Sequence, residues 1–154
     1  DLERMICMKT NKDPEYLYHF TSIENLREIL NTGIIKLCPS NLLKPINPHI
    51  VNDCLLDETD QVKPVVWFSS DGSFEHAVGN GLSLEKTQAV IVVPTSAVCF
   101  TKWDEWAVSN HIDCEWFEML KNTAPNWESF YVSELAVPIT EEIRIAFNKA
   151  LVDC

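Results

Sequence analysis

Residues 16–35 read YLYHFTSIENLREILNTGII, and this stretch decides the fold. Its first part, Tyr16 to Phe20, is mostly aromatic and follows Asp13-Pro14, which is typical of a short strand. A helix is predicted next, because Thr21 can cap it, Glu24 completes a capping box and Gly33 ends it. The apolar residues of this helix fall on one face: Ile23, Leu26, Ile29 and Leu30.

The rest of the chain contains more predicted strands than predicted helices. Strands are predicted at 34–37, 65–69, 89–93, 130–137 and 143–147, a short helix at 73–78, and one or two helices over 102–120. Because the strands do not alternate regularly with helices, the pattern favours an α+β fold over a doubly wound sheet. A chain of 154 residues has enough material for one core, so we expect a single domain over 1–154.

The segment from Cys38 to Lys63 carries three prolines and the acidic run Asp57 to Asp60, and it has no sustained period. This composition predicts a long surface loop. Loops of this length are uncommon in compact domains and often cover ligands. Two interpretations stay open at this point: a lid or binding loop, and a simple insertion.

The net charge of −11 limits the classes of partner. A strongly negative protein repels phosphate backbones, so non-specific binding of nucleic acid is not expected. One nucleotide can still be held in a local pocket by backbone amides and a single basic side chain. The charge therefore favours a protein target or a small molecule.

Six cysteines are scattered along the chain without a CxxC pair, which favours reduced thiols in a cytoplasm. Residues Asp1 to Lys9 contain no unbroken apolar stretch, so neither a signal peptide nor a membrane span is expected.

A metal site could be assembled from His49, His76, His111 and Cys114, but His111 and Cys114 form the only close pair among them in the sequence. We therefore expect no metal.

Two polar residues lie in apolar predicted strands. Glu134 lies beside Val132, Leu135 and Ala136, where an unpaired carboxylate would cost several kcal/mol to bury. It either reaches solvent on the outer face of the sheet or lines a cleft as a functional acid. His19 lies in an aromatic strand, where it is either a hydrogen-bonded core residue or a functional group.

Three segments resemble the motifs of the ADP-ribosyltransferase fold, in the order that the family has them. Tyr18 to Ile35 resembles the opening motif, an aromatic-His strand followed by a helix of form xxLxxIL, a glycine and a second strand. Val66 to Ser70 resembles the second motif, and Tyr131 to Pro138 resembles the third, which bears the acid. The likeness spans about residues 16 to 147. It is greatest to small bacterial and phage proteins, and more distant to DNA-thymidine ADP-ribosyltransferase toxins and tRNA 2′-phosphotransferases.

The resemblance implies a split, mixed β-sheet core with flanking helices and NAD lying across it as a substrate. His19 and Thr21 would contact ribose hydroxyls or the nicotinamide amide. Glu134 would hydrogen-bond the nicotinamide ribose and stabilise the positive charge that develops as nicotinamide leaves. The motif also implies that Trp67, Phe68 and Ser69 contribute to the NAD site, with an aromatic ring near the nicotinamide.

The chain departs from the family pattern at two points. The Tyr of the second motif has no counterpart, since Ser73 to Ala77 offers only Phe74. Glu128 is an alternative to Glu134 as the acid, although its place beside Asn126-Trp127 is more typical of a loop.

The resulting hypothesis is an NAD-dependent ADP-ribosyltransferase, or NAD glycohydrolase, in the cytoplasm. Its acceptor would be a macromolecule, a protein rather than a nucleic acid, and its setting a toxin or phage–host conflict with an antitoxin or inhibitor as partner. The competing hypothesis is a non-enzymatic acidic module that keeps this fold and covers a basic surface on its partner.

Overall fold

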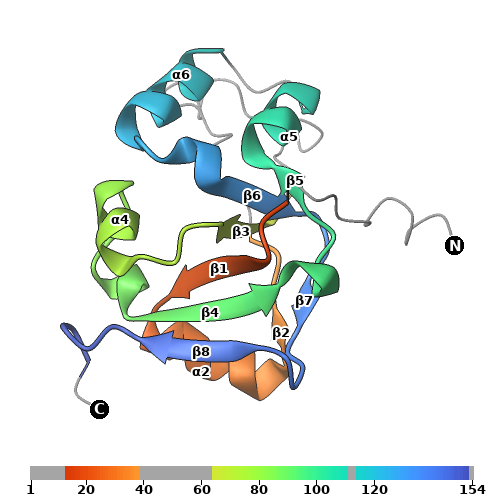
Figure 1. Cartoon of the computed structure of the whole chain (residues 1–154), viewed down its shortest axis with the longest axis vertical. Coiled ribbons are helices and arrows are strands. Elements are labelled where there is room, and N and C mark those ends of the chain that lie inside the picture. Colours follow the sequence, from red (N-terminus) through yellow and green to blue (C-terminus); the bar gives the residue numbers. More distant parts are fainter. Residues whose placement is uncertain (1–12, 39–63, 111–113, 153–154) are drawn as a thin grey trace, which may run out of the picture.

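The computed structural model describes residues 13–38, 64–110 and 114–152, and these form an α+β fold with two antiparallel sheets (Figure 1). The main sheet has six strands in the order β5-β6-β3-β1-β4-β8. Its strands are β1 (Tyr16–Thr21), β3 (Val66–Ser69), β4 (Ala89–Pro94), β5 (Thr101–Lys102), β6 (Phe130–Ser133) and β8 (Arg144–Phe147). The second sheet pairs β2 (Ile34–Ile35) with β7 (Val137–Pro138).

The predicted α+β class is confirmed, whereas the predicted mixed sheet is wrong. Every strand pair within the described residues is antiparallel. β1 lies near the middle of the main sheet, with Tyr18 paired to Ser69 of β3 on one side and to Val92 of β4 on the other. The strand that carries His19 is therefore held from both sides.

The helix after β1 forms as predicted, but its cap is one residue later. Helix α2 (Ile23–Thr32) begins after Ser22, whose hydroxyl accepts a hydrogen bond from the Asn25 N–H at 3.1 Å. Thr21, the expected cap, is the last residue of β1, and its hydroxyl accepts from the Asn25 side chain instead, at 2.8 Å. Gly33 ends the helix at φ 80°, a left-handed conformation that glycine adopts at no steric cost.

Three further helices and three short 3-10 turns complete the described fold. Helix α4 (Phe74–Gly79) confirms the short helix predicted at 73–78, and α5 (Trp103–Ser109) with α6 (Cys114–Thr123) confirms the prediction over 102–120. The 3-10 turns are η3 (Glu85–Thr87), η4 (Thr95–Ala97) and η5 (Trp127–Ser129). Figure 1 shows α5 and α6 at the β5-β6 end of the sheet, with α4 near the ends of β1 and β3.

The single strand predicted over 130–137 is wrong, because the chain leaves the main sheet after Ser133 and enters the second sheet at Val137. The buried Ser133 hydroxyl donates to the Leu135 carbonyl at 2.7 Å and accepts from the Leu135 N–H at 3.2 Å. Such local side-chain bonds replace ladder bonds and form a turn. Glu134 therefore lies in a bend and not in a strand.

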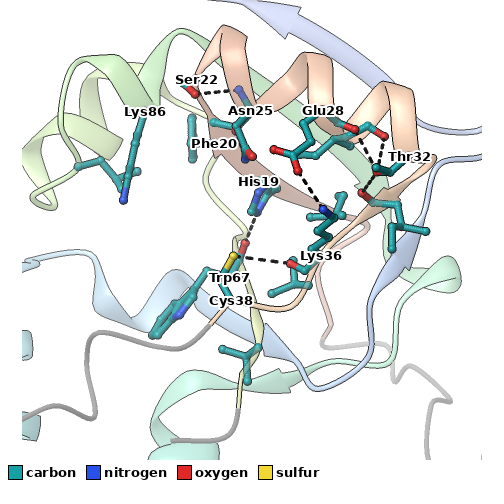
Figure 2. A pocket seen from close by; sticks show the side chains of 17 residues that line it. His19, Phe20, Ser22, Asn25, Glu28, Thr32, Lys36, Cys38, Trp67 and Lys86 are labelled. Carbon is teal, nitrogen blue, oxygen red and sulfur yellow. Dashed lines mark hydrogen bonds and ion pairs between the residues drawn. The ribbon is translucent and has the colours of Figure 1, made fainter.

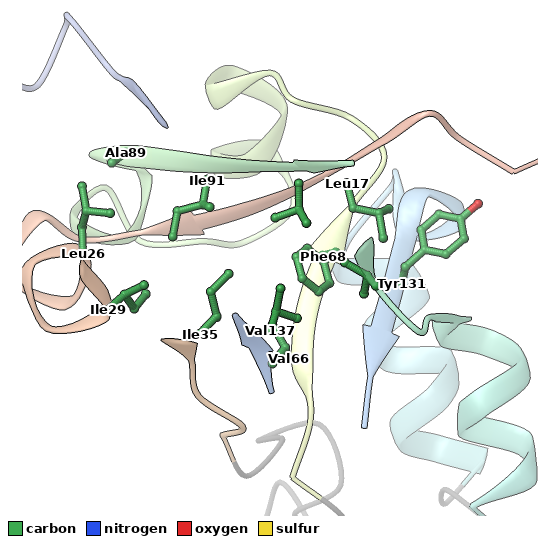
Figure 3. Packing of buried hydrophobic residues seen from close by; sticks show 12 residues of the cluster. Leu17, Leu26, Ile29, Ile35, Val66, Phe68, Ala89, Ile91, Tyr131 and Val137 are labelled. Carbon is green, nitrogen blue, oxygen red and sulfur yellow. The ribbon is translucent and has the colours of Figure 1, made fainter. Parts of the chain in front are cut away.

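Alternation along the strands divides the apolar side chains between two cores. The first, here the α2-side core, packs one face of the sheet against α2, β2 and β7 (Figure 3). The second, here the tryptophan core, packs the other face against α5. The α2-side core includes Leu17, Leu26, Ile29, Ile35, Val66, Phe68, Ile91, Tyr131 and Val137, and the tryptophan core includes Val65, Trp103, Trp106, Ala107 and Val132.

The predicted loop at 38–63 lies outside the described residues except for Cys38, which forms an isolated β-bridge with Val65.

The expectation of reduced thiols is wrong at Cys99, which is disulfide-bonded, whereas Cys38 and Cys114 are free. Since disulfides persist mainly in oxidising compartments, the expected cytoplasmic location loses the support that it drew from reduced thiols. No helix in the described ranges is long and apolar enough to span a membrane.

Candidate functional site

Two neighbouring clefts in the described part of the chain meet at His19. The first has a volume of about 490 Å³ and lies between β1, α2 and the start of β3. The second has a volume of about 520 Å³ and lies between β1, β3 and α4. They share a border made by the residues that line both: His19, Phe20, Cys38, Trp67, Leu82 and Lys86.

His19 is fixed in one orientation by β3. Its Nδ1 lies 2.7 Å from the Trp67 carbonyl oxygen, and its ring meets the edge of Phe68 with centroids 5.8 Å apart. Because a carbonyl only accepts, Nδ1 carries the proton and Nε2 is left as an acceptor. Burial lowers the pKa of His19 from its ordinary value of 6.5, and this effect exceeds the opposing effect of the Trp67 hydrogen bond.

The lowered pKa predicts a loss of stability in acid that depends on His19. Between pH 6.5 and the lower pKa of the folded state, the unfolded chain binds a proton at His19 that the folded chain does not. The free energy of unfolding should therefore fall as pH drops through this interval and stop falling below it. NMR titration of the ring protons measures the pKa, and urea unfolding at about pH 7.5 and about pH 5.5 measures the stability.

The control for this titration is His19→Asn, whose amide can still donate to the Trp67 carbonyl but does not titrate. The variant should lose the part of the pH dependence that belongs to His19. A His19 pKa at or above its ordinary value in the wild type would contradict the partly buried, neutral imidazole.

Charged and polar side chains surround His19 in the first cleft. Lys36 Nζ pairs with Glu28 at 2.9 Å, and Lys86 lies on the other side of His19 (Figure 2). Both side chains of the pair are more than half exposed, so the pair adds little to stability. Thr21 and Asn25 also line the cleft, and the Thr21 hydroxyl accepts a hydrogen bond from the Asn25 amide at 2.8 Å. The first cleft can therefore attract an anion and hydrogen-bond a polyol or an amide.

The five residues predicted to bind NAD all border these clefts. Thr21 lines the first cleft, Phe68 and Ser69 line the second, and His19 and Trp67 line both. They come from β1 and β3, which are adjacent in the sheet but separated by the whole segment 22–65 in the sequence. The structure thus brings these five predicted residues together.

Glu134 lies apart from this group and lines neither of the two clefts in the described residues. Its Oε1 accepts a hydrogen bond from Trp106 Nε1 at 3.0 Å, on the side of the tryptophan core. His19 follows the alternation of Leu17 and lies on the α2 side of the sheet. The structure therefore does not bring the Glu134 carboxylate and the His19 imidazole to one cleft. Glu128, the alternative acid, is exposed in η5 and also lines neither cleft.

A hydrogen-bonded Asp–His pair in the second cleft was not predicted from the sequence. Asp71 Oδ2 accepts from His76 Nδ1 at 2.6 Å and from Asn126 Nδ2 at 2.7 Å, while Oδ1 accepts from the Ser73 N–H at 2.9 Å. Burial by itself would raise the pKa of Asp71, but the hydrogen bonds and the nearby His76 outweigh burial and lower it. The sequence signal is weak, because Ser70-Asp71-Gly72 resembles an ordinary turn.

No group of three or more His, Cys, Asp or Glu side chains in the described ranges is arranged to hold a metal ion. Comparisons with protein-family models, curated proteins and solved structures give no match. The residues of the two clefts and the chemistry that they allow therefore indicate what the protein can do.

Proposed function

We propose that this protein binds NAD beside His19 and cleaves its nicotinamide–ribose bond, as an ADP-ribosyltransferase or NAD glycohydrolase. One observation carries the proposal: the five residues that the motif resemblance assigns to NAD border two adjoining clefts. These residues come from two short segments, 19–21 and 67–69, that are far apart in the sequence, and resemblance in a linear motif does not by itself require the segments to share a site.

The side chains of the clefts are suited to the parts of NAD. The neutral His19 ring offers Nε2 to a ribose hydroxyl or to the nicotinamide amide N–H. Lys36 and Lys86 supply positive charge for the pyrophosphate. Phe20 and Trp67 offer aromatic faces to the nicotinamide ring. Each cleft has a volume in the range of small-molecule sites.

Glu134 remains the proposed acid on the basis of its backbone position. It follows Ser133, which pairs with Val66, and Val66 lines the first cleft. Its carboxylate would stabilise the oxocarbenium-like charge on the nicotinamide ribose, as carboxylates do in glycoside cleavage. The Trp106 N–H holds one carboxylate oxygen on the tryptophan-core side, so the proposal requires the Glu134 side chain to turn toward the first cleft when NAD binds.

The test of the proposal is nicotinamide release from NAD by the purified protein, with and without cell lysate as a source of acceptors. The proposal predicts release by the wild-type protein. Release that increases with lysate would favour transfer over hydrolysis. No release under either condition would contradict the enzymatic function.

A second candidate function is a non-enzymatic acidic module that binds a basic partner surface. The observation that favours it is the hydrogen bond that holds Glu134 on the tryptophan-core side, away from His19. The net charge of −11 suits such a partner. Absence of both NAD binding and nicotinamide release would favour this module over the enzyme.

A further inference from the structure

The Asp71–His76 pair in the second cleft is held by hydrogen bonds from several elements. Asp71 follows β3, and its N–H donates to the Ser69 hydroxyl at 3.0 Å. The Ser69 hydroxyl in turn lies 3.0 Å from the Ser129 hydroxyl. His76 lies on α4, where its N–H donates to the capping hydroxyl of Ser73 at 3.2 Å. The imidazole and the carboxylate are thus positioned by the backbone as well as by each other.

This geometry determines which ring nitrogen of His76 can take a proton. An ionised carboxylate only accepts hydrogen bonds, so the nitrogen that faces Asp71, Nδ1, is the one that donates. In the neutral ring, Nε2 then carries a lone pair. His76 lines the second cleft and its side chain is 61% exposed, so this nitrogen is accessible to a substrate. A carboxylate that orients a histidine in this way is typical of a general base.

The second cleft borders the first along His19 and Trp67, so a molecule in it would be a neighbour of NAD bound at His19. We propose that the part of the second cleft beside His76 is the acceptor site, and that His76, oriented by Asp71, is the general base that deprotonates a hydroxyl acceptor, water included. The proposal rests on the NAD-cleaving function proposed above, and it names the acceptor class for that reaction.

The proposed step balances as a substitution at the anomeric carbon of the nicotinamide ribose. The acceptor oxygen forms a bond to this carbon, and its O–H proton passes to His76 Nε2. The bond to the nicotinamide nitrogen breaks, and its electron pair stays on that nitrogen, so nicotinamide leaves as a neutral molecule. His76 afterwards returns its proton to water. A hydroxyl needs this base, whereas an anionic nucleophile has no proton to lose.

Two variants test the base, and a third is their control. His76→Gln removes the titrating ring. Asp71→Asn places an amide donor where the carboxylate accepts, which moves the His76 proton to Nε2. Glu75→Gln changes a neighbouring exposed residue of α4 that lines neither described cleft. Circular dichroism and thermal unfolding show whether each variant is folded. His76→Gln changes an exposed side chain, so it tests the base even if Asp71→Asn disturbs the fold.

The assay follows ADP-ribose formation from NAD in buffer, with water as the acceptor, and then repeats it with sodium azide. We expect His76→Gln and Asp71→Asn to lose about 100-fold in rate or more, the range of general-base catalysis, with Glu75→Gln unchanged. Azide should restore turnover in both variants and yield ADP-ribosyl azide, because azide needs no base.

Three results would overturn the proposal, and they can be told apart. If His76→Gln forms ADP-ribose at the wild-type rate, the base assignment is wrong and the NAD-cleaving function stands. If both variants are slow but azide does not restore turnover, His76 acts in another way and the assignment is again wrong. If the wild-type protein itself releases no nicotinamide with or without cell lysate, the proposed function is wrong and this inference is wrong with it.

Discussion

Glu134→Gln is expected to reduce nicotinamide release by about 100- to 1,000-fold, the usual effect of removing one electrostatic group that stabilises a transition state. Glutamine has the same shape as glutamate and can still accept the hydrogen bond from Trp106 Nε1. The variant therefore removes the negative charge and keeps the shape of the side chain and its hydrogen bond to Trp106. Binding of NAD should persist, because the residues that border the clefts are unchanged.

Glu128→Gln is the matched control for this experiment, since Glu128 is also an exposed glutamate outside the two clefts. It should release nicotinamide at the wild-type rate. The opposite result, with activity lost in Glu128→Gln and kept in Glu134→Gln, would assign the acid to Glu128. Activity kept in both variants would show that neither glutamate is the acid.

Trp103→Ala is expected to reduce the free energy of unfolding by about 3–5 kcal/mol, the range for removing a buried tryptophan. Trp103 is 1% exposed and stacks on Phe117 with ring centroids 5.0 Å apart. It also contacts Trp67, Trp127 and Phe130, so it joins α5, α6 and the sheet. Alanine would leave a cavity at the centre of the tryptophan core, and urea unfolding measures the loss.

Trp103→Phe is the control for the effect of volume. The buried Trp103 Nε1 has no hydrogen-bond partner within the described residues, so phenylalanine removes an unsatisfied donor while keeping an aromatic ring. We expect it to cost less than half of what alanine costs. Equal destabilisation by both variants, or a loss below about 1 kcal/mol for alanine, would contradict the central role of this side chain.

The elements that could be predicted from the sequence are those specified by local signals. Strand β1 and helix α2 have an aromatic run, a capping residue and a terminal glycine within one short stretch, and the structure has both elements there. The strand predicted over 130–137 failed because its apolar residues belong to two sheets. The break at Ser133 depends on a side-chain hydrogen bond that hydrophobic periodicity does not report.

The residues of the candidate site also divide into those that local sequence signals predict and those that they do not. The five residues assigned to NAD lie in strands or at their ends, so correct prediction of β1 and β3 was enough to bring them together. The side on which Glu134 lies depends on the break after β6 and on Trp106 of α5. The contact of Asp71 with Asn126 joins residues 55 positions apart, and no local pattern links them.

Binding of NAD beside His19 is the central claim, and calorimetric titration of NAD into the wild-type protein and into His19→Asn tests it most directly. Asparagine can keep the donor to the Trp67 carbonyl, but its own carbonyl oxygen lies closer to the backbone and cannot take the position of Nε2. We predict saturable binding at one site in the wild type and at least about tenfold weaker binding in the variant, the effect of one lost hydrogen bond. No binding to the wild type, or equal binding to both proteins, would contradict the claim.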